Sequence, residues 1–200
     1  LDTYGMVQTL MADFPDFLAN TYDQYYLYPE YKASHLDPDF TRADEVMAGR
    51  EKRVFKECEE VIREGKLGDR FDAISDAHAE MMIKVAEAIA YNKNERHILI
   101  VENNGAIANM QDDAMVEVVC ELGANGPRPM SVGNIPQFNL GLLVNQVSCE
   151  KLIVDAYFEN SYQKALEAFT LNRLINDAKK ARKVLDALIE ANRGMWPELR

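Results

Sequence analysis

The sequence lacks the features that mark several common classes of protein. Only three of its 200 residues are cysteines, Cys58, Cys120 and Cys149, and none belongs to a CxxC pair. The odd number and wide spacing of these cysteines predict reduced and buried thiols rather than redox or metal roles. The longest apolar run, at residues 98–101, is far shorter than a membrane span. No basic-then-apolar start typical of a secretory signal is present.

A basic surface is also lacking, because the net charge is −11. This charge argues against nucleic acid as a partner and fits a soluble, cytoplasmic protein that does not act on membranes. A phosphorylated ligand would need a local basic patch. Apolar and charged contents of 48% and 28% are ordinary for a globular protein. The length favours one domain, with two small ones as the alternative.

No glycine-rich GxGxxG or Walker pattern occurs, and strands and helices do not alternate regularly. The order of elements instead predicts an α+β fold with helices around a small mixed sheet. Strands are expected at 96–103, 115–122 and 130–133, with 96–103 central because it is apolar on both faces. A turn is expected at 124–129. Helices are expected at 3–18 and 20–28, after Thr41 and Ser75, from Pro136, and at 161–172 and 177–192.

The helix after Thr41 has clear start and stop signals. Thr41 and Asp44 resemble a capping box, and Gly65 suits the residue after the last turn. Apolar residues recur along this helix with a period of 3.6 residues. This period predicts a buried stripe formed by Met47, Val54, Phe55, Cys58, Val61 and Ile62. The next helix is expected to bury Met82, Val85, Ala86, Ile89 and Ala90.

The stretch "NTYDQYYLYPEY", residues 20–31, holds five of the nine tyrosines. Tyr22, Tyr25 and Tyr26 have the spacing of one helical face. Two interpretations fit, an aromatic core cluster or a site in which one phenol acts as a base. A phenol has a pKa near 10, so it acts as a base only where the proton to be removed has been made acidic.

Other polar groups each allow a functional and a structural interpretation. Arg42 with the cluster Arg50, Lys52 and Arg53 either grips a phosphate or forms a solvated helix surface with Glu51, Glu59 and Glu60. Asp76 and His78 form either a carboxylate–imidazole pair or a cap and a surface histidine. The segment Asn103–Asn104–Gly105 either presents amides to a ligand or makes a tight turn. Asp112 and Asp113 are expected to serve a turn.

Four long stretches together resemble glycoside hydrolase family 4. They are "NTYDQYYLYPEY", "TRADEVMAGREKRVFKEC", "DAHAEMMIKVAEAIAYNKNERHILIVENNGAIANM" and "QVSCEKLIVDAYFENSYQKALEAFTLNR". Within the family they look most like the 6-phospho-α-glucosidases, which cleave maltose 6′-phosphate and similar phosphodisaccharides. Two departures are Asp44, where the family motif has Asn, and Ala19, where relatives tend to have Pro.

The resemblance implies an unusual reaction, because this family departs from the two-carboxylate mechanism of most glycosidases. It uses NAD and a Mn²⁺-type metal: the sugar is oxidised at C3, deprotonated at C2 and cleaved by elimination. The family motif places the C2 base at Tyr22 and a substrate-binding arginine at Arg42. Cys58 belongs to a different stretch from the metal-binding cysteine. No cofactor-binding or metal-binding residue is therefore expected in this chain.

The resemblance also implies a place within a larger protein. Residues 1–200 resemble the C-terminal, substrate-side domain, which is similar to that of lactate dehydrogenases, without the Rossmann half that binds NAD. We expect a fragment that folds but does not turn over alone, from an enzyme that forms a homo-dimer or tetramer. The alternatives are a phospho-β-glucosidase or α-galacturonidase of the same family, or a non-catalytic oligomerisation module.

Overall fold

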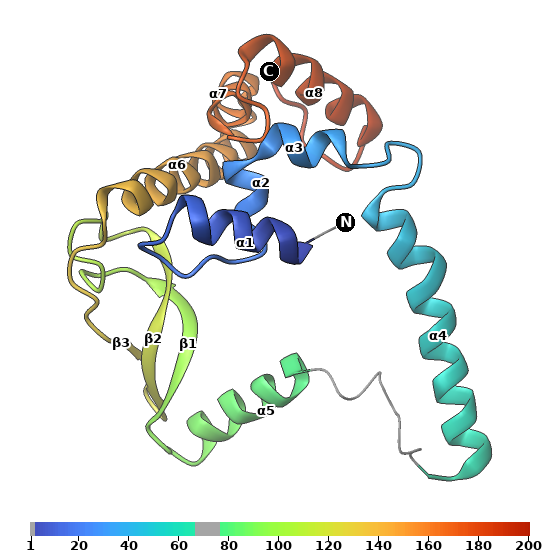
Figure 1. Ribbon diagram of the computed structural model, residues 1–200, viewed down its shortest axis with the longest axis vertical. Helices are drawn as coiled ribbons and strands as arrows, with labels where there is room; N and C mark the ends of the chain where they lie inside the picture. Colours follow the sequence, from blue (N-terminus) through green and yellow to red (C-terminus); the bar gives the residue numbers. More distant parts are fainter. Residues whose placement is uncertain (1–2, 67–76) are drawn as a thin grey trace. The chain divides into compact units, whose positions relative to one another are not determined.

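The computed structural model describes residues 3–66 and 77–200, which form helices and a small sheet (Figure 1). The chain divides into two compact units. The first is Leu1–Ala33, Ile100–Val118 and Ser131–Arg200, and the second is Ser34–Leu99 and Val119–Met130. The α+β class expected from the sequence is confirmed.

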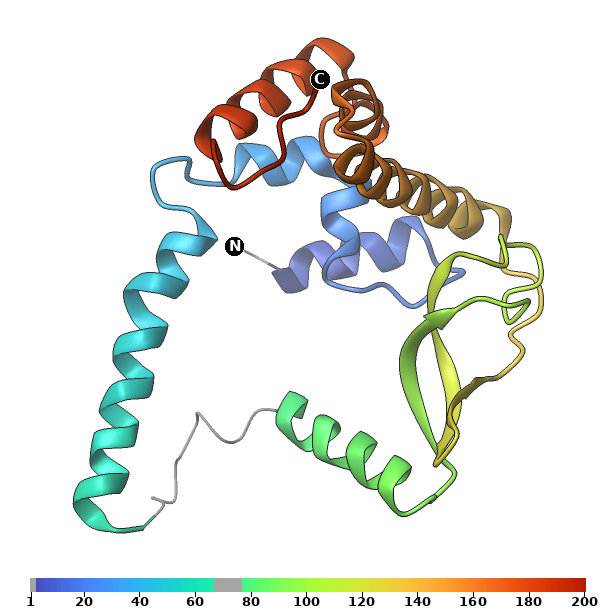
Figure 2. The same ribbon diagram turned by 180° about the vertical axis from the view of Figure 1, so that it is seen from behind.

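The first unit is mainly helical. It contains α1 (Thr3–Asp13), α2 (Asp23–Leu27), α3 (Pro29–Ser34), α6 (Gln137–Glu159), α7 (Tyr162–Leu171) and α8 (Ala178–Ala191). Figures 1 and 2 show α6, α7 and α8 side by side, and α7 packs against both of the others. Their core joins Ala156, Ala165 and Leu185, one from each helix. The helices expected at 161–172 and 177–192 are confirmed, and Ser161 and Asp177 cap them.

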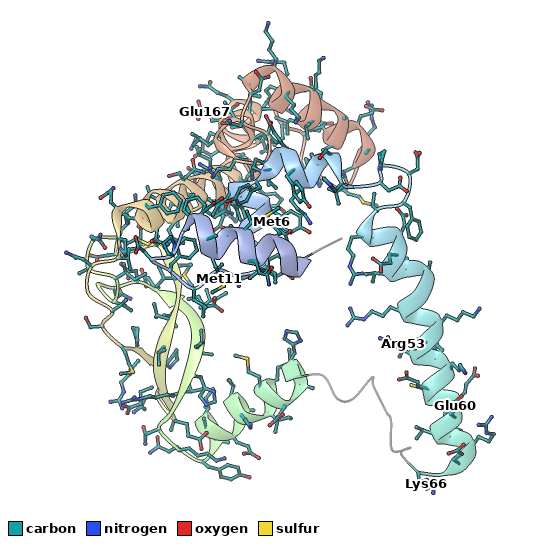
Figure 3. The ribbon with its side chains drawn as sticks, in the orientation of Figure 1. Met6, Met11, Arg53, Glu60, Lys66 and Glu167 are labelled. Atoms are coloured by element: carbon teal, nitrogen blue, oxygen red, sulfur yellow. The ribbon has the colours of Figure 1, made fainter. Side chains whose placement is uncertain are left out.

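Helix α1 ends five residues before the expected position. Pro15 explains this, since a proline disfavours helical backbone at the residue before it. Phe14 then stacks on Phe138 at the start of α6, with ring centroids 5.1 Å apart. Met6, labelled in Figure 3, is buried, whereas Met11 is exposed. Helix α1 therefore has one buried face.

The second unit contains α4 (Arg42–Glu64) and α5 (Ala77–Ala90). The capping box of Thr41 and Asp44 is confirmed, and so is the left-handed Gly65 after the last turn. The predicted buried stripe of α4 is wrong: Met47, Phe55, Cys58 and Ile62 are exposed, and Val54 and Val61 are half-buried. The predicted buried face of α5 is wrong as well, since Met82, Ala86, Ile89 and Ala90 are exposed. Ser75 lies outside the described residues.

The sheet has the order β1 (Glu95–Glu102), β2 (Met115–Gly123), β3 (Gly126–Pro129), and β2 pairs with β3 antiparallel. The strand expected to be central, 96–103, is instead at the edge of this sheet, with Ile98 and Ile100 exposed. The third strand lies where a turn was predicted. Gly123 pairs with Gly126, so the actual turn is shorter than expected. A parallel bridge between Ile107 and Gly133 lies outside these strands.

The turn predicted at Asn103–Asn104–Gly105 is present, with positive φ at Asn104 and Gly105. Asn103 is fully buried, and its amide nitrogen donates to the carbonyl oxygens of Ile107 and Met110 at 3.0 and 3.2 Å. This amide therefore holds the loop rather than a ligand. No described helix is both long and apolar enough to cross a membrane.

Candidate functional site

Tyr22 lies in a tight turn immediately before α2. The Asn20 side-chain oxygen accepts from the Tyr22 backbone N–H at 2.8 Å, and the Asp23 carboxylate accepts from the Asn20 N–H at 2.6 Å. These two bonds fix the backbone on both sides of Tyr22, as Asn and Asp side chains commonly do in turns. The Tyr22 residue is 69% exposed. The side chain is therefore presented to solvent on a constrained backbone.

The tyrosines of this segment do not form a core. Tyr26 and Tyr31 are also exposed, and Tyr25 is half-buried. The ring of Tyr25 stacks on that of Tyr22, with centroids 6.3 Å apart. The interpretation as an aromatic core cluster is therefore wrong, while Tyr25 does support the Tyr22 ring by packing.

A buried cation also contacts the Tyr25 ring. Lys32 in α3 is 3% exposed, and its Nζ lies 4.8 Å from the centroid of the Tyr25 ring. An ammonium over an aromatic face is attracted by the ring quadrupole. No local pattern in the sequence predicts this contact, because Tyr25 and Lys32 belong to two different short helices, and α3 begins at Pro29.

Tyr28, in contrast to Tyr22, makes a hydrogen bond that connects two helical segments. Its hydroxyl donates to the Asp13 carboxylate at the end of α1. This hydrogen bond, with smaller contributions from burial and from the charge of Asp13, raises the pKa of Tyr28 to about 12. Tyr28 therefore stays protonated near neutral pH and ties the α2–α3 segment to α1.

A cleft of about 290 Å³ lies beside α2 in the first unit. Its walls come from α2, α6 and the segment after α7: Asp23, Tyr26, Leu27, Asn139, Leu142, Leu143, Asn145, Gln146 and Arg173. Arg173 donates its Nε–H to the Tyr26 carbonyl oxygen at 2.9 Å. A larger hollow of about 530 Å³ beside Asn160 includes none of the tyrosines in its lining. The cleft beside α2 thus contains side chains that can donate hydrogen bonds. One of its walls is α2, the helix that begins directly after Tyr22.

Arg42 is the first residue of α4, in the second unit. Its guanidinium pairs with the Glu45 carboxylate, and its side chain is 76% exposed. The hydroxyl and backbone N–H of Thr41 donate to Asp44, and these bonds hold the pKa of the Asp44 carboxyl below its ordinary value. Arg42 and Tyr22 belong to different units.

Several of the remaining candidates make contacts that favour the structural interpretation. Within α4, Arg53 lies 4.0 Å from Glu57, and Lys56 lies 3.8 Å from Glu60, which fits the solvated-surface interpretation. Asp113 pairs with Lys151. Asp76 lies outside the described residues, so its pairing with His78 is untested. Cys120 and Cys149 are buried as predicted, whereas Cys58 is exposed.

Residues 3–66 and 77–200 contain no group of three or more His, Cys, Asp or Glu side chains that could hold a metal ion. Lys32 and Arg173, which support the Tyr22 segment, were missed by the sequence analysis. Arg173 ends one of the four stretches that carry the resemblance, but its partner is 147 residues away.

Comparisons with known proteins extend over the whole chain. A crystal structure of a 6-phospho-alpha-glucosidase from gut microorganisms, in complex with NAD and Mn²⁺, is 81% identical with a TM-score of 0.92, covering 100% of this chain and 46% of that one. A second such enzyme from gut microorganisms, in complex with NAD and glucose-6-phosphate, is 44% identical with a TM-score of 0.91, covering 99% of this chain and 45% of that one. The maltose-6′-phosphate glucosidase MalH of Clostridium acetobutylicum is 48% identical over 99% of this chain and 45% of its own length.

The chain thus spans about half the length of the relatives that it matches. Residues 2–175 match the family model described as the family 4 glycosyl hydrolase C-terminal domain. The resemblance carried by the tyrosine-rich stretch and the three others is confirmed. The chain belongs to the family 4 glycosyl hydrolases, as a C-terminal domain of that family.

Proposed function

We propose that this chain is the substrate-side part of an NAD- and Mn²⁺-dependent 6-phospho-α-glucosidase that hydrolyses 6-phospho-α-glucosides such as maltose 6′-phosphate. The observation that carries the proposal is 81% identity over the entire chain to a 6-phospho-alpha-glucosidase with nearly the same fold. The α-type assignment is supported further by the 48% identity to a maltose-6′-phosphate glucosidase.

In this proposal Tyr22 is the proton acceptor. When bound, the nicotinamide supplies oxidation at C3 of the sugar, which makes the neighbouring C2–H acidic. A phenol is a weak base near neutral pH, so it needs an acidified proton of this kind. The exposed side chain and the turn fixed by Asn20 and Asp23 suit a group that must meet a bound sugar in one orientation.

Arg42 is proposed to bind substrate. Its exposed guanidinium is a bidentate donor on a chain of net charge −11, so it offers a local attraction for an anionic sugar phosphate. The Glu45 carboxylate orients it in the free protein, and a phosphate would compete for the same donors.

NAD and Mn²⁺ are assigned to the part of the relatives' length that this chain does not span. We further propose that the complete protein is cytoplasmic, where phosphorylated sugars occur, and that it assembles as a homo-dimer or tetramer.

The test is an assay of two forms, the 200-residue chain and a form of the relatives' full length. Each receives NAD, Mn²⁺ and a chromogenic 6-phosphoglucoside of either anomer. We expect the long form to cleave the α-anomer and the 200-residue chain to be inactive. Cleavage of only the β-anomer by the long form contradicts the substrate class. Robust turnover by the 200-residue chain contradicts the proposed division of the site.

A further inference from the structure

The turn before α2 places a phenol where a helix usually has a capping group. Tyr22 is the N-cap residue of α2, and its side chain makes no capping hydrogen bond. Ser, Thr, Asp and Asn are preferred at this position, because their side chains satisfy the free N–H groups of the first turn. A residue that breaks a local preference of this kind often marks a functional site. The backbone at Tyr22 must therefore be held by other residues.

Helix α2 is too short to hold this position by itself. It has five residues, and helices shorter than about twelve residues are marginal in water without packing. Of these five residues, Gln24 is the one that is buried, with 4% of its surface exposed. A buried amide needs hydrogen-bond partners inside the protein, because leaving it unpaired is costly. The Gln24 side chain is therefore the anchor through which α2 is fixed.

The Gln24 amide reaches back to the peptide group that leads into Tyr22. Its Nε2 donates to the Thr21 carbonyl oxygen at 2.5 Å. The N–H of the same peptide group, which belongs to Tyr22, donates to the Asn20 side-chain oxygen at 2.8 Å. Both polar atoms of this peptide group are thus held by side-chain amides. Because a peptide group is planar, holding both atoms fixes the direction in which the chain enters Tyr22.

The two hydrogen bonds differ in how easily water can replace them. Asn20 is exposed, so a water molecule can take its place on the Tyr22 N–H. Gln24 is buried and its bond to Thr21 is partly buried, so water reaches this bond less readily. The bond from Gln24 is therefore expected to contribute more to the order of the turn.

We propose that Gln24 is a positioning residue for Tyr22, a buried amide that sets the direction of the phenol by holding the peptide group between Thr21 and Tyr22. Gln24 does not contact substrate in this proposal and acts through Tyr22 alone. A displacement of about 1 Å can cost a reaction roughly 100-fold in rate, so such a clamp affects the chemical step. The inference rests on the proposed role of Tyr22 as proton acceptor.

Gln24→Met tests the donor, because methionine has a similar length and no N–H. In the full-length form we expect kcat, and exchange of the substrate C2 hydrogen with deuterated water, to fall by roughly 10- to 100-fold. KM is expected to stay within about threefold, because the contacts that bind substrate are kept. Gln24→Glu keeps the shape but places carboxylate oxygens against the Thr21 carbonyl oxygen, so a loss at least as large is expected.

Gln163→Met is the matched control. Gln163 is exposed on α7, where its amide donates to the Glu167 carboxylate at 2.9 Å. This variant is expected to keep the kinetics of the native enzyme. Thermal denaturation checks that each variant is folded at the assay temperature. Native kinetics in Gln24→Met overturn the proposal.

A double variant separates positioning from general damage to the fold. Tyr22→Phe removes the hydroxyl through which Gln24 is proposed to act. Adding Gln24→Met to Tyr22→Phe should therefore lower the residual exchange by less than about twofold. A loss that multiplies with that of Tyr22→Phe would mean that Gln24 acts elsewhere in the protein, and it overturns the proposal.

Crystal structures of the native and Gln24→Met full-length forms give a readout that needs no turnover. In the variant we expect the peptide group between Thr21 and Tyr22 to be reoriented, or the Tyr22 ring to occupy more than one rotamer. An unmoved Tyr22 in a single rotamer overturns the proposed clamp. A native full-length form that cleaves neither anomer contradicts the proposed function instead, and the two structures still decide for or against the clamp.

Discussion

Arg173 donates its Nε–H to the backbone carbonyl oxygen of Tyr26 at 2.9 Å, although the two residues are 147 positions apart. Tyr26 lies in the last turn of α2, where helix carbonyls lack intrahelical partners. A cation is also favourable at a helix C-terminus. The segment after α7 therefore holds the short helix that follows Tyr22.

Replacing Arg173 should loosen this helix. Arg173→Met removes the donor and leaves the Tyr26 carbonyl to solvent, at a cost of roughly 0.5–1.5 kcal/mol of local stability. We expect kcat of the full-length form to fall about tenfold, since a base that moves by an ångström loses much of its efficiency. The measurement is steady-state kinetics together with hydrogen exchange of the α2 amides.

Arg193→Gln is a matched control, because Arg193 is exposed and pairs with Glu190 at the end of α8. This variant is expected to keep full activity. Equal kinetics for Arg173→Met and Arg193→Gln would show that the contact with Tyr26 does not position the helix.

Tyr22→Phe removes the proposed proton acceptor and keeps the aromatic ring that stacks on Tyr25. In the full-length form we expect exchange of the substrate C2 hydrogen with deuterated water to fall by roughly 10²–10⁴, the range for loss of a general base. Tyr25→Phe, which retains the same ring stack, is expected to keep most of the exchange. Unchanged exchange in Tyr22→Phe with intact assembly would favour a non-catalytic module.

Local signals in the sequence predicted local structure well. Thr41, Asp44 and Gly65 gave both ends of α4, because capping depends on residues three or four apart. The turn at Asn103 was predicted for the same reason. The exposed Tyr22 side chain follows from a turn that Asn20 and Asp23 build within four residues.

Burial was predicted poorly, because it depends on what lies opposite a face. The stripe of α4 has the period of a core helix, yet Phe55 and Ile62 are exposed. Strand β1 is apolar on both faces but lies at a sheet edge, with Ile98 and Ile100 exposed. Long-range partners such as Lys32 with Tyr25, or Arg173 with Tyr26, leave no periodic pattern in one sequence.

The loop held by Asn103 should be sensitive to substitution. Its amide nitrogen also lies 3.1 Å from the Gln111 carbonyl oxygen, and its side-chain oxygen accepts from the Ile107 N–H at 2.7 Å. Asn103→Ala leaves these buried groups unpaired, so we expect a loss of roughly 2–4 kcal/mol in the free energy of unfolding. Urea denaturation measures this loss.

Asn104→Gly is the control for this loop. Asn104 is exposed with a φ of 42°, a conformation that glycine adopts freely. We expect a change within about 0.5 kcal/mol. A similar loss in both variants would mean that the loop as a whole, rather than the buried amide, is responsible.

The start of α4 should depend on pH through Asp44. Hydrogen bonds from the Thr41 hydroxyl and backbone N–H hold the pKa of this carboxyl below its ordinary value of 3.8. The folded state therefore binds the proton less readily than the unfolded chain. The stabilisation is complete above the unfolded-state pKa and is lost as the pH falls through the lower folded-state pKa.

Asp44→Asn should remove this dependence, because its amide does not titrate. The difference in melting temperature between the native chain and Asp44→Asn is expected to be constant from pH 5 to neutrality and to shrink as the solution is acidified below about pH 4, near the ordinary carboxyl pKa. Asp16→Asn, in the exposed loop after α1, is the control and should show no such convergence. A difference that persists undiminished at pH 2 would mean that Asp44 caps α4 through its shape rather than its charge.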